Sequence, residues 1–248
     1  MKILLHGAAG HMGRIVRDLI ESRNDCELAA AVDASGADGC LSLLDEFTGN
    51  ADCIIDFSHH SATSALLQYA GSRSIPLVIA TTGQTEYERA AIAEAADRIP
   101  VFFSANMSPA IAMLADMAAQ AAAMFPDADV EIVERHHNRK VDVPSGTALL
   151  LAHAIQGALP DSTLLIGRHE NGRRRKREIS IHSLRMGNEV GTHEIIIATG
   201  MQTITLKHDA EDRALFAEGA LAAAEFIIRQ PAGLYAMQDL IDARATTR

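Results

Sequence analysis

The sequence predicts an α/β protein built from a doubly wound parallel sheet and a second domain with a mixed sheet. Three observations lead to this prediction. Apolar strand-like segments alternate with helix-like segments from the start of the chain to Asn106. A glycine-rich turn, GAAGHMG, joins the first strand to the first helix. Beyond residue 177, β-branched segments are separated by glycine turns without long helices between them, which is typical of a mixed or antiparallel sheet.

The first strand–helix pair predicts a dinucleotide site. An apolar strand at residues 3–5 precedes Gly7, Gly10 and Gly13, and an amphipathic helix follows. Glycines at such positions let the backbone turn tightly and approach a pyrophosphate, which the helix N-terminus then holds. The next strand ends at Asp33, about where a ribose-binding carboxylate is expected. A purely structural glycine turn is the alternative.

Asp33 also bears on the form of the cofactor. Its carboxylate would accept a hydrogen bond from the ribose 2′-hydroxyl and repel a 2′-phosphate. Ala34 and Ser35 follow it, so no adjacent arginine is present to hold that phosphate. The sequence therefore favours NADH over NADPH.

Further strands are expected at residues 51–58, 75–83 and 100–106, with helices at 61–72 and 85–98 between them. In parallel sheets of this kind, ligands bind over the carboxyl ends of the strands. Polar residues at those ends are therefore candidate cofactor contacts, although each one alone is also consistent with ordinary loop chemistry. They are Ser58, Thr81, Thr82 and Asn106.

Residues 131–148, EIVERHHNRKVDVPSGTA, contain the strongest candidate for an active site. A strand leads into His136 and His137, then come Lys140 and Asp142, and the Pro-Ser-Gly-Thr turn opens an apolar helix. The first N–H groups of a helix lack internal partners, so with Lys140 they form a seat for a carboxylate or phosphate. A histidine beside that seat can hold or release a proton near neutral pH. A charged surface loop ahead of a well-capped helix is the alternative.

The second half of the chain is expected to contain strands at 178–187, 192–200 and 201–209. A helix at 108–125 carries a stripe of Met and Leu, which indicates core or subunit interface rather than a cofactor site. A long helix at 212–230 follows the last strand, and a short terminal helix comes after it.

Composition excludes several classes of protein. The net charge of −10 over 248 residues argues against general nucleic-acid binding, and the basic run at 173–177 favours a solvated loop or hairpin tip whose charge attracts an anionic substrate. A 48% hydrophobic content without an apolar run near 18 residues indicates a globular protein with no membrane span. No signal peptide is expected, because MKILLHGAAG leads directly into a strand. Three cysteines without metal-binding spacing predict reduced cytoplasmic thiols and no metal site.

These residues resemble the dihydrodipicolinate reductase family, also called 4-hydroxy-tetrahydrodipicolinate reductases, of bacterial lysine biosynthesis. The resemblance spans essentially the whole chain and rests on GAAGHMG, DFS, ATTG, SANMS, E-x-x-E-x-HH-x-x-K-x-D-x-PSGTA and SLRMGNEVGTHE. The histidine–lysine–PSGT signature is long and specific, whereas the glycine triplet is not. The resemblance implies NAD(P)H-dependent reduction of 4-hydroxy-tetrahydrodipicolinate or dihydrodipicolinate to tetrahydrodipicolinate in the diaminopimelate pathway.

The resemblance also implies an organisation and a set of site residues. It implies a Rossmann-like dinucleotide-binding domain at 1–107 and 213–248, and a substrate-binding domain at 108–212 that builds a homotetramer, with Arg213 near the hinge. His136 resembles the proton donor and Lys140 the second catalytic residue, which holds a substrate carboxylate. The implied substrate contacts are His137, Ser145, Gly146 and Thr147. The implied cofactor contacts are Gly7, Ala8, Ala9, Gly10, His11, Met12, Asp33, Ala80, Thr81, Thr82, Ser104, Ala105, Asn106 and Met107.

Two departures and two alternatives accompany this reading. Ala80 stands where the family usually has glycine, and Met107 where phenylalanine is common, so the nicotinamide pocket is expected to differ slightly. Another nicotinamide dehydrogenase on the same scaffold, such as an aspartate dehydrogenase, is one alternative, although the PSGT cradle beside His136 and Lys140 argues against it. A non-catalytic NAD(H)-binding regulator, which would not need His136, is the other.

Overall fold

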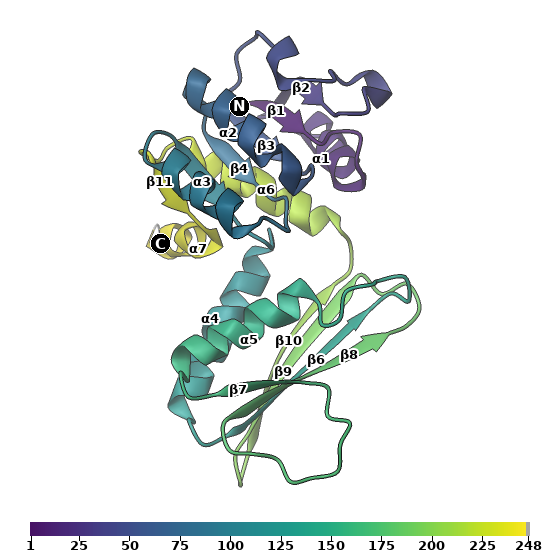
Figure 1. The fold of residues 1–248 in the computed structure, drawn as a ribbon, viewed down its shortest axis with the longest axis vertical. Coiled ribbons are helices and arrows are strands. Elements are labelled where there is room, and N and C mark those ends of the chain that lie inside the picture. Colours follow the sequence, from purple (N-terminus) through teal and green to yellow (C-terminus); the bar gives the residue numbers. More distant parts are fainter. Residues whose placement is uncertain (247–248) are drawn as a thin grey trace. The chain divides into compact units, whose positions relative to one another are not determined.

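The structure, a computed structural model, describes residues 1–246, and the chain divides into two compact units (Figure 1). The first comprises Met1–Pro109 together with Arg213–Arg248, and the second is Ala110–Asp212. The chain therefore leaves the first unit, builds the second, and then returns to complete the first. Each unit is described by itself below.

The first unit is built around a parallel sheet. Its strands are β1 (Lys2–His6), β2 (Glu27–Val32), β3 (Cys53–Asp56), β4 (Leu77–Ile79), β5 (Pro100–Phe103) and β11 (Gly233–Tyr235). Its helices are α1 (His11–Glu21), α2 (Thr63–Arg73), α3 (Glu86–Ala96), α6 (Ala214–Ile227) and α7 (Met237–Thr246). Short 3-10 turns span Ala37–Gly39, Leu44–Glu46 and His60–Ala62. The strands lie in the order β11-β5-β4-β3-β1-β2, and every neighbouring pair is parallel.

This sheet confirms the predicted doubly wound fold. The residues of β3 and β4 are all buried, as expected for parallel strands covered by helices on both faces. After β1 the chain adds β2 on one side of β1 and β3 on the other, so the strand order reverses between β1 and β3. A ligand crevice forms at the carboxyl ends of the strands where such a reversal occurs.

The second unit is built around a mixed sheet. Its strands are β6 (Asp129–His136), β7 (Thr163–Ile166), β8 (Glu178–Arg185), β9 (Gly191–Ala198) and β10 (Thr203–Ala210), and its helices are α4 (Pro109–Met124) and α5 (Gly146–Ala158). The order is β10-β9-β6-β8-β7. β8 pairs with β6 and β7 in parallel, whereas β9 pairs with β6 and β10 antiparallel. The predicted mixed sheet is therefore confirmed.

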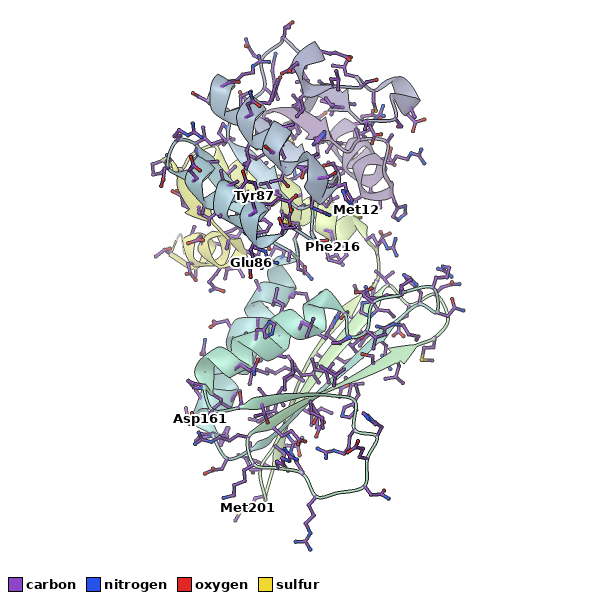
Figure 2. All side chains as sticks on the ribbon, in the orientation of Figure 1. Met12, Glu86, Tyr87, Asp161, Met201 and Phe216 are labelled. Carbon is purple, nitrogen blue, oxygen red and sulfur yellow. The ribbon has the colours of Figure 1, made fainter. Side chains whose placement is uncertain are left out.

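The side chains of this sheet alternate between two environments. Val130, Ile132, Ile195 and Ile197 point to one face, where α4 and α5 contribute the rest of the core (Figure 1). Residues between them, such as Val133, are only half-buried. The turn between β9 and β10 projects into solvent at its tip, where Met201 is 99% exposed (Figure 2). Within residues 1–246, no helix has the length and apolar character needed to cross a membrane.

Candidate active site

The glycine turn after β1 forms a cradle that only glycine can build. Gly7 has φ +79°, and an added Cβ would lie 2.5 Å from the Phe57 carbonyl oxygen. A Cβ on Gly13, inside α1, would lie 2.1 Å from the Gly7 carbonyl oxygen. Gly10 precedes α1 without any side-chain cap, and Met12 lies in the first turn (Figure 2). The N-terminus of α1 therefore faces an open backbone cradle, which fits a dinucleotide pyrophosphate.

Asp33, immediately after β2, lies against this turn. One carboxylate oxygen accepts the Ala9 N–H at 3.1 Å, and the other accepts the N–H and hydroxyl of Ser35 at 3.0 and 2.5 Å. The hydrogen bond from the Ser35 hydroxyl is the main cause that lowers the pKa of Asp33 from its usual value. Asp33 is thus an ionised acceptor beside the glycine turn.

A buried pair that the sequence analysis does not predict lies where the strand order reverses. His6 Nδ1 is 2.8 Å from Asp56 Oδ1, and the two residues are partners in the β1–β3 pairing. The same Asp56 oxygen accepts the N–H and hydroxyl of Ser58 at 3.2 and 2.6 Å. The Asp56 carbonyl accepts the Ala80 N–H at 3.0 Å. Hydrogen bonds therefore connect the ends of β1, β3 and β4. The sequence did contain a signal for this pair, because His6 directly precedes Gly7 and Asp56 is the first residue of DFS.

The remaining candidate cofactor contacts differ in their exposure. Thr82, Ala105 and His11 are exposed. Thr81 and Met107, in contrast, are 6% and 2% exposed, so they pack against the protein itself. The segment after β5 is held by its own side chains: Ser104 donates to the Asn106 carbonyl at 2.6 Å, and Asn106 Oδ1 accepts the Ser108 N–H at 2.8 Å.

In the second unit, His136 is the last residue of β6 and is 7% exposed. Its Nδ1 lies 2.5 Å from Glu134 Oε2. Glu134 is fully buried and also receives two hydrogen bonds from the Arg185 guanidinium, at 2.8 and 2.9 Å. Burial opposes ionisation of Glu134, but the hydrogen bonds from His136 and Arg185 outweigh it and hold the pKa of this carboxyl well below its usual range.

The start of α5 is held against these strands. Ser145, the N-cap residue, accepts the Ala148 N–H through its hydroxyl at 3.1 Å, as Ser commonly does at this position. Its own N–H donates to Glu134 at 3.2 Å. Gly146 opens the helix, and an added Cβ there would meet no atom within 4 Å. Packing therefore does not require glycine at this position, and the helix N-terminus has room for a ligand.

Two more residues complete the surroundings of His136. His193 of β9 packs edge-on against it, with ring centroids 5.2 Å apart, and its Nε2 lies 3.1 Å from the Ser145 hydroxyl. Burial, and after it the electrostatic effect of the neighbouring His136, lowers the pKa of His193 to about 3. His193 is therefore neutral at neutral pH. Lys140 pairs with Asp142 at 2.8 Å, and its backbone N–H donates to the His137 carbonyl at 3.1 Å.

Glu134, Arg185 and His193 were not among the site residues predicted from the sequence. A signal for Glu134 was present, because the alternation that buries Val130 and Ile132 continues to Glu134 and His136 on the same face. A carboxylate and a histidine on a core-facing row require partners. Arg185 and His193 lie about fifty residues further along the chain, within SLRMGNEVGTHE, and the strand pairing places them beside His136.

The basic run at 173–177 lies in a loop, as expected, but one of its residues is not fully solvated. The other four basic residues are exposed, but Arg174 is half-buried. It bonds to Asp129, Glu131 and the Val130 carbonyl of β6. Arg177 pairs with Asp161 at 2.8 Å, and Figure 2 labels Asp161. Two of the five charges are therefore engaged within the unit, because acidic residues of neighbouring segments lie within their reach.

The fold and the two sites define a class of protein. A doubly wound parallel sheet with a glycine cradle and an acidic residue after β2 is the architecture of a nicotinamide-dependent oxidoreductase. The second unit adds a buried histidine–carboxylate pair, a lysine and an open helix N-terminus, which suit an anionic substrate that must be protonated.

Comparison with known proteins identifies the family. Residues 1–107 match the family described as "Dihydrodipicolinate reductase, N-terminus", and residues 110–241 match "Dihydrodipicolinate reductase, C-terminus". The chain belongs to the dihydrodipicolinate reductase family. It is therefore an NAD(P)H-dependent oxidoreductase of lysine biosynthesis by the diaminopimelate route, as the resemblance implied.

Individual relatives agree with this assignment. The chain is 43% identical over 246 residues to a 4-hydroxy-tetrahydrodipicolinate reductase of Caldanaerobacter subterraneus subsp. tengcongensis, covering 97% of this chain and 98% of that protein. It is 39% identical to the same enzyme of Alkaliphilus metalliredigens over 247 residues, covering 97% and 99%. Among solved structures, the dipicolinate-bound dihydrodipicolinate reductase of Paenisporosarcina sp. TG-14 aligns with a TM-score of 0.77 and 24% identity, over 95% and 97% of the two chains.

The family assignment also decides against the dehydrogenase alternative. The aspartate dehydrogenase of Thermotoga maritima aligns with a TM-score of 0.52 and 14% identity, over 91% of this chain and 96% of that chain. That likeness shows a shared fold alone.

Proposed function

We propose that the protein reduces 4-hydroxy-tetrahydrodipicolinate, or the dihydrodipicolinate formed from it, to tetrahydrodipicolinate, with His136 as the proton donor. The proton-donor role is supported chiefly by the buried His136–Glu134 pair, which lies beside the N-terminus of α5. This pairing holds a histidine next to an anion seat, which a dicarboxylate with a reducible double bond requires.

His136 would complete the reduction. Bound NAD(P)H supplies the hydride. Hydride arriving at a conjugated C=C–C=N unit leaves negative charge on the substrate, and a carbon of the substrate must then take a proton. In that step the Nε2–H bond of His136 breaks, the proton forms a C–H bond, and the electron pair remains on Nε2.

Lys140 and the start of α5 would hold the two carboxylates. Lys140 is half-buried and pairs with Asp142, whose side chain is 57% exposed, so water screens the attraction and the partner is easily exchanged for a substrate carboxylate. Gly146 and Thr147 lie at the helix N-terminus, where backbone N–H groups and the dipole favour an anion. Ser145 would contribute mainly by capping α5, which fixes the position of the helix N-terminus. His137 is half-buried beside Lys140 and is a further substrate contact.

The substrate class can be tested against the dehydrogenase alternative. Purified protein is supplied with NADH and either the substrate made by the preceding synthase or oxaloacetate with ammonia. We expect oxidation of NADH with the synthase product only. Turnover of oxaloacetate with ammonia at a comparable kcat/KM would contradict the proposal.

We also infer that the enzyme uses NADH in preference to NADPH. Asp33 is ionised beside the glycine turn, so it would attract a ribose hydroxyl and repel a 2′-phosphate. Two arginines of α1 reach the loop after β2, but both bind Asp38. The Arg14 guanidinium pairs with the Asp38 carboxylate at 2.9 Å, and the Arg17 guanidinium donates to the Asp38 backbone carbonyl at 3.2 Å. Because these contacts are largely exposed, they are weak, and NADPH remains a usable second cofactor.

Replacing Asp33 with alanine tests this preference. Loss of one charged acceptor is expected to weaken the binding of NADH by about tenfold. The affinity for NADPH should change less, because the substitution also removes the charge that repels the 2′-phosphate. Cofactor titration by fluorescence measures both affinities. Asp52→Asn is the matched control, because Asp52 is an exposed carboxylate of the same unit that accepts the Lys2 N–H at 2.7 Å. Equal weakening of both cofactors by Asp33→Ala would contradict the inference.

We further propose a cytoplasmic homotetramer in which the second unit forms the subunit contacts. The face of its sheet that points away from the core includes Val133 and Ile196, which are half-buried, and Leu184, which is 41% exposed. Apolar side chains at partly exposed positions of such a face favour burial against another copy. The free thiols of Cys26, Cys40 and Cys53 fit a reducing compartment. Sedimentation velocity measures the assembly, and a monomer at micromolar concentration would contradict the tetramer.

A further inference from the structure

Glu134 occupies the centre of a small network in the second unit. Its carboxylate is fully buried and accepts hydrogen bonds from three different elements. These come from His136 Nδ1 on its own strand at 2.5 Å, from the Arg185 guanidinium on β8, and from the Ser145 N–H at the start of α5. A buried carboxylate is costly unless it is paired and fully hydrogen-bonded, and this one is both.

The position of Glu134 in β6 shows that packing alone does not account for it. The core-facing row of this strand runs Val130, Ile132, Glu134, His136. The first two are aliphatic side chains in the shared core with α4 and α5. An aliphatic residue at 134 would extend that core without the cost of desolvating a charge. The carboxylate stands instead beside the histidine that the proposed function uses as proton donor.

The contact with His136 determines which ring nitrogen carries the exchangeable proton. The ionised carboxylate of Glu134 has only acceptors, so Nδ1 of His136 must hold its hydrogen. Nε2 is then the nitrogen that gains and loses a proton. It points toward the backbone of Gly191 on β9, where an added Cβ would lie only 2.9 Å from Nε2. Glycine at 191 thus leaves the space that the proton-bearing edge of the ring occupies.

The contact with Ser145 links the same carboxylate to the anion seat. The Ser145 N–H donates to Glu134, while its hydroxyl caps α5 and contacts His193. The N-terminus of α5 is therefore anchored to β6 and β9 at the point where His136 is anchored. A shift of Glu134 would move the histidine and the seat together.

We propose that Glu134 is a positioning residue of the proposed reaction: it fixes the Nδ1–H tautomer of His136, so that Nε2 delivers the proton, and it sets the start of α5 relative to that nitrogen. The proposal rests on the proposed role of His136. Arg185 serves it indirectly, because its two hydrogen bonds hold the carboxylate in the orientation that both contacts need.

The charges around His136 give the sign of the pH effect. Glu134 is negative, and Arg185 is positive and forms an ion pair with Glu134. His193 on β9 is neutral. His208 on β10 and Lys140 also act electrostatically on His193; burial lowers the pKa of His208, and Lys140 pairs with Asp142. Replacing Glu134 with glutamine removes the negative charge that favours the imidazolium. The acid form of His136 is then lost at lower pH, so the decline of kcat/KM with rising pH moves to lower pH.

Histidine NMR of the full-length protein tests the proposal directly. The 11 histidines are labelled with 15N, and His136→Gln identifies the His136 signals by their loss. In the wild-type protein we expect neutral His136 to carry its proton on Nδ1. In Glu134→Gln we expect a mixture of tautomers, a titration midpoint moved to lower pH, and kcat reduced roughly 10–100-fold, by analogy with the carboxylates that orient metal-bound histidines.

Glu131→Gln is the matched control. Glu131 lies on the same strand but on the opposite face, where it accepts from His182 at 2.7 Å and pairs with Arg174. This variant should leave the His136 signals and the pH profile unchanged. A purely structural role of Glu134 would lower kcat, if at all, without changing the His136 tautomer or the pH profile.

The outcomes separate this proposal from the proposed function. Wild-type His136 with its proton on Nε2, or a tautomer and midpoint unaltered in Glu134→Gln, overturns the positioning role and leaves the reductase assignment intact. A changed tautomer with an unaltered kcat supports the contact but overturns the proton-donor role of His136. If Glu134→Gln does not fold, the wild-type tautomer alone decides, because the proposal requires Nδ1–H.

Discussion

The His136→Gln enzyme is expected to lose roughly 10²–10⁴-fold in kcat, the range typical of a general acid. Glutamine has a similar reach and can still donate a hydrogen bond to Glu134, so the buried carboxylate keeps a partner. Its amide cannot transfer a proton to carbon at neutral pH. The substrate therefore still binds and hydride addition remains possible, but the charge that it leaves is not neutralised.

The affinity for NADH should stay close to that of the wild-type enzyme, because the glycine cradle and Asp33 belong to the other unit. Steady-state kinetics with a separate cofactor titration measures the two quantities. His153→Gln is the matched control, since His153 is exposed on α5 and lies outside the histidine–carboxylate network. An undiminished kcat in His136→Gln would remove the proton-donor role, and a matching loss of NADH affinity would point to a folding defect instead.

Replacing Lys140 with alanine should lower kcat/KM for the substrate by about 10²–10³-fold, as expected when one preorganised charged donor is removed from an active site. The ammonium both orients a carboxylate and offsets the charge that develops during reduction, so KM should rise and kcat should fall. Asp142, which pairs with Lys140 at 2.8 Å, would add repulsion once its partner is gone.

The neighbouring residue supplies the comparison for Lys140. Arg139 is an exposed cation whose guanidinium donates to the Asn188 side chain at 2.8 Å. Arg139→Ala removes the same net charge one residue away and should leave the kinetics near those of the wild type. Unchanged kinetics in Lys140→Ala, or an equal loss in both variants, would contradict the proposed carboxylate seat.

Local patterns were sufficient to predict most of the fold. The strand–turn–helix units before Asn106 and the β-branched runs after residue 177 correspond to the two observed sheets. β7 (TLLI) and β11 (GLY) were not predicted, because both are short and lie at the edges of their sheets. Their strand character comes from pairing with β8 and β5, which the local sequence does not encode.

The candidate site was only partly predictable, for a related reason. His136, Lys140 and the PSGT turn lie within a dozen residues, so their proximity is visible in the sequence. The partners that govern His136 are distant in the chain, and the pairing of β6 with β8 and β9 brings Arg185 and His193 beside it. The engagement of Arg174 with acidic residues of β6 escaped prediction for the same reason, since it spans more than forty residues.

The most direct test of the reductase assignment is a coupled assay. The preceding synthase generates the substrate in situ from pyruvate and aspartate semialdehyde, and the loss of nicotinamide absorbance is followed with NADH and NADPH side by side. We expect oxidation that depends on the synthase, with a higher kcat/KM for NADH. Tight binding of NADH without synthase-dependent oxidation would contradict the reductase assignment and indicate a cofactor-binding regulator instead.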